Sequence, residues 1–103
     1  MNITKTEAQV LQLLIAASGS ELYGLEMVKA SGGTLKRGTI YVILGRLEDK
    51  GFVESHKEVL DENAPPAAPR RLYQATGTGR RIYHAYETYH KEVSGHGLLG
   101  AIA

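Results

Sequence analysis

The sequence predicts an α+β domain, mainly helical, in which three helices are followed by a two-stranded hairpin and a fourth helix. Two observations predict this order. First, apolar residues recur at helical spacing through the first half of the chain. Second, this spacing is lost after residue 51, where a proline-rich segment separates two short stretches that resemble strands. With 103 residues, the chain has the length of one domain.

Composition excludes several classes of protein. The absence of cysteine excludes a disulfide scaffold and a thiolate metal site. No apolar run is long enough to span a bilayer, and the N-terminus lacks the pattern of a signal peptide, so a cytoplasmic protein is expected. The chain has 12 Lys and Arg residues against 11 Asp and Glu residues, and its formal net charge of +1 taken alone argues against holding nucleic acid by bulk electrostatics.

The first two helices are placed by their start and stop signals. Thr4 and Glu7 have the spacing of a capping box, so the first helix is expected over about residues 4–18. A second, short helix is expected over about residues 22–31, because two glycines follow it directly. The side chains expected to face inward on this helix are Leu25 and Val28, with Met27 beside them.

The third helix is expected over about residues 36–51 and has two distinct faces. Its core face should carry Ile40, Ile43, Leu44 and Leu47. Its opposite face should carry Gly38, Tyr41, Val42, Gly45 and Arg46. An exposed glycine inside a helix costs up to about 1 kcal/mol relative to alanine, so two glycines on one face suggest that another molecule approaches the backbone there.

The hairpin and the last helix complete the order of elements. Residues 52–60 and 70–75 read as two strands, joined by a proline-rich loop over 61–69. Thr76 can cap the last helix. A heptad-like seam on that helix is formed by Ile82, Tyr86, Tyr89 and Val93. Residues 95–103 contain too many glycines to be predicted as helix.

This order is that of a winged helix-turn-helix, in which the third helix enters a DNA major groove and the hairpin, called the wing, lies on the flanking backbone. Cations in the first turn of the third helix oppose the helix dipole, a conflict that an anionic partner would relieve. Hydroxyl, aromatic and guanidinium groups follow on the same face. The candidate DNA-binding residues of this helix are Lys36, Arg37, Gly38, Thr39, Tyr41 and Arg46.

A second basic group lies around the hairpin. Arg70 and Arg71 stand at its base, where phosphate contacts are expected, and are the remaining candidate DNA-binding residues. Arg80 and Arg81 begin the last helix and could instead pair with Glu87 or with another subunit. The wing also carries the acidic residues Glu54, Glu58, Asp61 and Glu62. Its tip is therefore not expected to enter the minor groove, and the near-neutral net charge is the sum of two segregated sets of charges.

The residues resemble those of the PadR family of bacterial transcriptional regulators over about residues 7–80. The resembling positions are Glu7, Val10, Leu11, Leu13 and Leu14, then Tyr23-Gly24, then Gly38-Thr39-Ile40-Tyr41, Leu44, Arg46-Leu47-Glu48 and Lys50-Gly51-Phe52-Val53, and finally Arg71, Tyr73, Thr76 and Gly79. The resemblance implies a homodimeric winged helix-turn-helix that binds promoter or operator DNA, usually as a repressor, with the C-terminal helix pairing the subunits. It implies DNA contacts by Lys36, Thr39 and Tyr41, and support of the wing by Arg71.

We therefore expect residues 1–76 to form the winged helix-turn-helix and residues 77–103 the dimerisation helix and tail, within one compact domain. The dimer interface should contain Ile82, Tyr86, Tyr89 and Val93. The absence of a phosphate-binding loop, a dinucleotide fingerprint and a nucleophile motif argues against an enzyme, and no cofactor is expected.

Three alternatives qualify this interpretation. The histidines of the last helix, His84 and His90, are six residues apart and do not share a face, so no metal site is expected. A winged-helix module that binds protein through its acidic wing is the alternative function. A regulator with a small-molecule effector in the dimer cleft is a third possibility that no motif specifically indicates.

Overall fold

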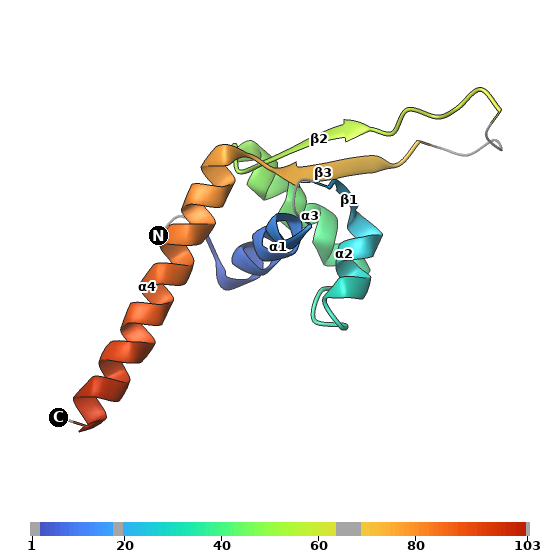
Figure 1. Ribbon diagram of the computed structural model, residues 1–103. Helices are drawn as coiled ribbons and strands as arrows, with labels where there is room; N and C mark the ends of the chain where they lie inside the picture. The colour runs from blue at the N-terminus through green and yellow to red at the C-terminus, as the bar shows by residue number, and fades with distance from the viewer. Residues whose placement is uncertain (1–2, 18–19, 64–68, 103) are drawn as a thin grey trace.

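The computed structural model describes residues 3–17, 20–63 and 69–102, with side chains described as far as residue 91. The elements in chain order are α1 (Lys5–Ala16), β1 (Leu22–Tyr23), α2 (Gly24–Ala30), α3 (Arg37–Asp49), β2 (Val53–Lys57), β3 (Arg71–Ala75) and α4 (Gly77–Ile102). Figure 1 shows α1, α2 and α3 packed beneath a small sheet, with the hairpin and α4 projecting in opposite directions. The predicted α+β winged-helix architecture is confirmed.

The start of α1 is capped as the sequence predicts. The Thr4 hydroxyl accepts a hydrogen bond from the Glu7 N–H at 3.1 Å, and the Glu7 carboxylate accepts one from the Thr4 N–H at 2.8 Å. This reciprocal pair satisfies two backbone donors that a helix N-terminus otherwise leaves without partners. The helix ends at Ala16, two residues before the predicted end.

The region around α2 differs from the prediction. Residues 22 and 23 form β1, which pairs with β3, so the helix begins only at Gly24. A strand of two residues has no periodicity of its own and exists through its distant partner, which explains why local patterns missed it. The side chains also differ, because Met27 is fully buried whereas Leu25 and Val28 are half-buried. Val28 nevertheless packs against the core as predicted, and the residue placed wrongly is Met27, which was expected beside the inward positions and is the fully buried one.

The third helix has the predicted core face, and a glycine ends it. Its four predicted core residues are at most 3% exposed. Gly51 has φ +78°, a conformation that favours glycine. Its N–H donates to the carbonyl of Glu48, and the next N–H, of Phe52, donates to that of Leu47, both at 2.9 Å. This is a Schellman motif, which turns the chain directly from α3 into β2.

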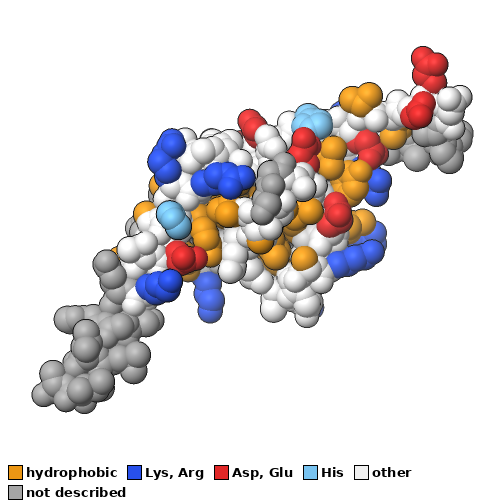
Figure 2. All heavy atoms as spheres, in the orientation of Figure 1, with side chains coloured by type: hydrophobic (Ala, Val, Ile, Leu, Met, Phe, Trp, Pro, Cys, Tyr) orange, Lys and Arg blue, Asp and Glu red, His pale blue; other side chains and the backbone are white. Residues whose placement is uncertain are grey.

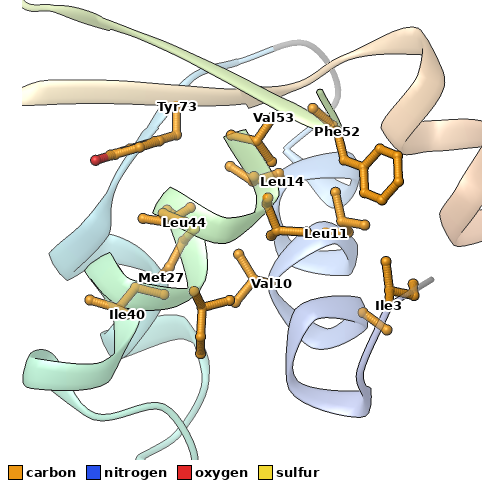
Figure 3. Close-up of a cluster of buried hydrophobic side chains, with 14 of the residues drawn as sticks. Ile3, Val10, Leu11, Leu14, Met27, Ile40, Leu44, Phe52, Val53 and Tyr73 are labelled. Atoms are coloured by element: carbon orange, nitrogen blue, oxygen red, sulfur yellow. The ribbon is translucent and has the colours of Figure 1, made fainter. Parts of the chain in front are cut away.

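The sheet has three antiparallel strands in the order β1-β3-β2, one more than the predicted hairpin. β2 pairs with β3 from Val53↔Ala75 to Lys57↔Arg71. β2 ends at Lys57 rather than at residue 60, although the Glu58 N–H still donates to the Arg70 carbonyl at 2.7 Å. Figure 3 shows Phe52, Val53 and Tyr73 directed from the sheet side onto Leu11, Leu14 and Leu44. This core holds α3 against the sheet by one face only.

A buried ion pair joins the start of α1 to the end of α3. Glu7 is 1% exposed, and its carboxylate oxygens lie 3.0 and 2.9 Å from Lys50 Nζ. Burial opposes the ionisation of Glu7, but the hydrogen bonds from the Thr4 N–H and from Lys50 outweigh it and lower the pKa of this carboxyl. Glu7 therefore serves both the helix cap and the packing of two helices.

The last helix begins as predicted and continues further. The Thr76 hydroxyl accepts from the Gly79 N–H at 3.0 Å and donates to the Gly51 carbonyl at 2.7 Å. A Cβ at Gly79 would lie 2.0 Å from the carbonyl oxygen of Phe52, so only glycine lets α4 pack this closely. The helix runs to Ile102 and so includes most of the glycine-rich segment 95–103, whose conformation the sequence did not determine. Glycine lowers helix propensity but, unlike proline, keeps its N–H and does not block the helix.

Candidate nucleic-acid interface

The exposed start of α3 carries basic side chains that have no ion-pair partner among the described residues. Lys36 is the N-cap residue, its side chain makes no capping hydrogen bond, and no acidic residue stands in the first turn. The side chains of Lys36, Arg37 and Arg46 are exposed and make no ion pair with any residue that the structure describes. Their charges, together with the free N–H groups of the helix start, are available to an anion.

Both glycines of this face are open to the outside. A Cβ placed on Gly38 or on Gly45 would meet nothing within 4 Å. Packing within the described chain therefore does not require glycine at either position. The remaining groups on the face are the exposed side chains of Thr39, Tyr41 and Val42, of which Tyr41 is 48% and Val42 52% exposed.

Tyr41 is positioned by α2. A Cβ at Gly24 would lie 2.7 Å from Tyr41 Cε1 and 2.9 Å from its hydroxyl oxygen. The first residue of α2 therefore leaves the space that the phenol ring occupies. The sequence identified Tyr41 as an exposed aromatic donor, whereas the structure shows that α2 supports one side of its ring.

Arg70 and Arg71 do not lie at the base of the hairpin, as the sequence predicted, but at the other end of the strand pair: Arg71 faces Lys57 where the loop begins, whereas Val53 faces Ala75 next to the helices. We call this point, where the long loop leaves the sheet, the wing base, and its two arginines are engaged within the molecule. Arg70 lies with its guanidinium carbon 3.8 Å from the centroid of the Tyr23 ring, and its Nη2 is 3.4 Å from Glu58 Oε2. The Tyr23 hydroxyl donates to the same carboxylate. This hydrogen bond, and to a smaller extent the charge of Arg70, lowers the pKa of Glu58. Arg71 Nη1 donates to Ser55 Oγ at 2.9 Å across the strand pair.

A hollow of about 400 Å³ joins Tyr41 to Arg70 and Arg71, and the other predicted residues of α3 do not line it. It is lined by Tyr41 from α3, by Arg70 and Arg71 from the wing base, and by Lys29 and Tyr23 between them. Residues that lie about 30 positions apart in the sequence thus share one surface. Lys29 was missed by sequence reasoning, because a single lysine near the end of a short helix carries no pattern.

The acidic residues of the wing lie partly at its far end. Figure 2 shows acidic side chains at the tip of the hairpin, at the upper right, whereas basic side chains lie over the body. Asp61 and Glu62 are exposed there, and Glu54 accepts a hydrogen bond from Gln74. The charges of Asp61 and Glu62 thus lie apart from the basic residues, but Glu58 forms an ion pair with Arg70, so the predicted segregation of the two sets of charges holds only in part.

The predicted dimer residues fall into two groups. Ile82 and Tyr86 are half-buried against the core of their own chain, on the side of α1, whereas Tyr89 is 55% exposed. The Tyr86 ring lies 4.1 Å from that of His90. Val93 lies outside the residues whose side chains are described. Arg80 and Arg81 are exposed, and Arg81 donates to the Thr78 hydroxyl at 3.2 Å rather than to Glu87.

Two features bear on other classes of function. Within the described residues, no helix is both long and apolar enough to cross a membrane. Among those same residues, no three metal-ligating side chains gather in one place.

Comparisons with known proteins identify the family. A search of curated proteins gave no match. Among solved structures, a PadR-like transcription factor from Bacteroides fragilis has a TM-score of 0.71 and 24% identity, over 95% of this chain and 89% of that one. A PadR family transcriptional regulator from Eggerthella lenta has a TM-score of 0.69 and 26% identity, over 91% and 80%.

A third similar structure was determined in complex with DNA. Bacillus subtilis PadR in complex with operator DNA has a TM-score of 0.67 and 21% identity, over 81% of this chain and 47% of that one. The model of the PadR-like transcriptional regulator family matches residues 10–85, from within α1 to the first turns of α4. The chain therefore belongs to the PadR-like family of transcriptional regulators.

Proposed function

We propose that this protein binds double-stranded operator DNA in a sequence-specific manner as a homodimer and represses transcription by blocking a promoter. The observation that carries the proposal is the outer face of α3, where Lys36, Arg37 and Arg46 are exposed without ion pairs in a stretch free of acidic residues. Such cations bind phosphates with release of counterions and without breaking internal contacts. Membership of a family of transcriptional regulators supports the same function.

In this proposal α3 enters the major groove and the base of the wing lies on the flanking backbone. The DNA-binding residues are Lys36, Arg37, Gly38, Thr39, Tyr41, Arg46, Arg70 and Arg71. The operator complex of Bacillus subtilis PadR supports double-stranded DNA as the partner. Binding to a promoter requires that protein and DNA share a compartment, so a cytoplasmic location is part of the proposal.

The dimer would form through residues 77–103, with residues 1–76 as the DNA-binding part. Ile82 and Tyr86 are only half-covered by their own chain, and Tyr89 is more exposed still, so a second α4 could cover all three. Paired recognition helices would then lie about 34 Å apart in successive major grooves of a pseudo-palindromic site.

Binding is tested with fluorescent promoter DNA at several salt concentrations. We expect the association constant to fall steeply as salt rises, and the variant with Lys36, Arg37, Arg70 and Arg71 replaced by alanine to lose binding. The control variant Arg80→Ala/Arg81→Ala removes two charges at the other end of β3 and should retain it. Unchanged affinity in the fourfold variant would contradict the proposal and favour a module that binds protein.

The dimer is tested by sedimentation. Tyr89→Glu alone places a charge on an exposed seam position and should produce monomers without unfolding the chain, because its side chain does not contribute to the core. The double variant with Tyr86→Glu should be monomeric as well, and circular dichroism checks that it remains folded. Two variants that both stay dimeric would show that the seam lies elsewhere.

A further inference from the structure

The ridge of α3 that faces directly away from the core carries one apolar side chain between two glycines. Gly38 precedes Val42 by four residues and Gly45 follows it by three, so all three lie on one face. The buried residues Ile40, Ile43, Leu44 and Leu47 lie on the opposite face. Val42 is 52% exposed. Between Gly38 and Gly45, Val42 is thus the single side chain beyond Cα on this ridge, which ends one turn after Gly45 at the exposed Asp49.

This ridge has a poor composition for a helix surface in water. Exposed glycine is less favourable in a helix than alanine, and a β-branched residue such as valine is less favourable than an unbranched one. A Cβ at Gly38 or Gly45 would meet nothing within 4 Å, so the described chain gains no packing from either glycine. The composition is better explained if the surface of another molecule approaches the backbone of α3 and contacts Val42.

The surroundings of Val42 decide which kind of surface this is. Arg46 and Arg37 are exposed on the same helix and have no ion-pair partner among the described residues. Against an apolar protein surface these charges would lose water without compensation. Against DNA they face phosphates, while the middle of the helix faces base edges in the major groove.

Val42 offers methyl groups and no hydrogen-bonding atom in its side chain. The apolar feature that bases present in the major groove is the C5-methyl group of thymine. We propose that Val42 is a specificity-determining residue that packs against a thymine methyl at one position of each half-site. The inference rests on the proposed function, because it needs α3 in the major groove, and it adds a base identity that the charged residues do not provide.

The test removes the thymine methyl alone. A binding site is selected from random duplexes, and each thymine is then replaced in turn by uracil, which keeps every hydrogen-bonding group. At one position per half-site, uracil should weaken binding of the unchanged protein about threefold to tenfold, as expected for the burial of one methyl contact. Val42→Ala should bind the thymine and uracil duplexes equally at that position. Alanine is the better helix former, so the variant should remain folded.

A matched control is available in the wing. Val59 is 92% exposed and lies beyond the end of β2, so Val59→Ala makes the same change away from α3 and should retain the discrimination between thymine and uracil. Salt-dependent binding that is indifferent to every uracil would overturn the inference and leave the proposed function intact. Discrimination that survives in Val42→Ala would overturn it as well. If no duplex is selected and binding shows no salt dependence, the proposed function itself fails.

Discussion

The two basic regions of this surface differ in how their charges are held. At the start of α3, Lys36 and Arg37 are exposed and have no ion-pair partner among the described residues. At the base of the wing, Arg70 stacks on Tyr23 and contacts Glu58, while Arg71 donates to Ser55. Sequence patterns give these pairs equal weight, because both are adjacent cations near an expected DNA surface.

The difference teaches that a cation count does not measure readiness to bind phosphate. A free lysine or arginine gains a phosphate and loses only its counterions and water. An arginine that already faces a carboxylate must share its charge, so its gain from a phosphate is smaller. The contacts at the wing base therefore hold its arginines in a fixed orientation. The start of α3 should supply most of the free energy of DNA binding.

The largest expected effect is a difference in DNA affinity between variants of the two basic pairs. Lys36→Ala/Arg37→Ala should weaken DNA binding at low salt by about 100-fold and reduce the slope of log K against log salt by about 2. Arg70→Ala/Arg71→Ala should weaken binding by about tenfold or less and reduce the slope by about 1. Fluorescence anisotropy at four or more salt concentrations measures both quantities. Equal losses from the two pairs would remove the distinction between the regions.

A smaller effect is expected from the support of Tyr41. In Gly24→Ala, the added methyl would lie 2.7 Å from Tyr41 Cε1, so the ring must move away from α2. We expect DNA affinity to fall about fivefold to tenfold, the loss of one good contact, with a small change in melting temperature. The same substitution in a Tyr41→Ala background should have little further effect, because its target is gone. Additive losses would show that Gly24 acts by another route.

A gain of affinity is expected when Arg70 is released. Glu58→Gln removes the charge that faces Arg70 while leaving an oxygen that can accept from Tyr23, so affinity should rise about twofold to threefold. Glu54→Gln removes the same charge from β2, four residues earlier in the chain, where the partner is Gln74 rather than an arginine. Equal gains from both variants would indicate a general effect of acidic charge. A larger gain from Glu58→Gln supports an internal competition for Arg70.

The smallest effect concerns the pH dependence of the wing. His56 on β2 contacts Glu21, and its Nδ1 lies 3.1 Å from the carbonyl oxygen of Lys57. The hydrogen bond to that carbonyl and the contact with Glu21 raise the pKa of His56 above 6.5. Its stabilising contribution is therefore fully present below pH 6.5 and is lost as pH rises through the raised value.

Histidine chemical shifts and thermal melts between about pH 5.5 and about pH 8.5 measure this contribution. His56→Gln should abolish the part of the pH dependence that falls in this window. A His56 pKa at or below its value in an unfolded peptide would contradict the assigned contacts.

Local signals predicted the parts of the fold that depend on neighbours in sequence. The capping box of Thr4 and Glu7, the cap at Thr76 and the glycine stop at Gly51 each act within a few residues. The core face of α3 followed from its period. These features were predictable because the atoms that decide them are consecutive.

The parts of the fold and of the candidate site that the sequence did not predict depend on contacts between distant segments. β1 exists through β3, about 50 residues later, and Met27 is buried because α2 starts where β1 ends. In the candidate site, the support of Tyr41 by Gly24 and the engagement of Arg70 by Tyr23 and Glu58 join separate elements. The sequence could name candidate residues for the site, but it could not show which of their charges already had partners within the molecule.

The ion pair between Glu7 and Lys50 has a consequence for the thermodynamics of recognition. It fixes the end of α3 that lies far from Lys36, where the Schellman turn also joins the helix to the sheet. The C-terminal end of α3 is thus held against α1 and the sheet, and its N-terminal end, at Lys36, is exposed for binding. A recognition element that is rigid before binding loses little conformational entropy on docking, so more of its contact energy is retained as affinity. Weakening this remote clamp, by Lys50→Met for example, should make binding entropically less favourable in calorimetry although no DNA contact has been removed.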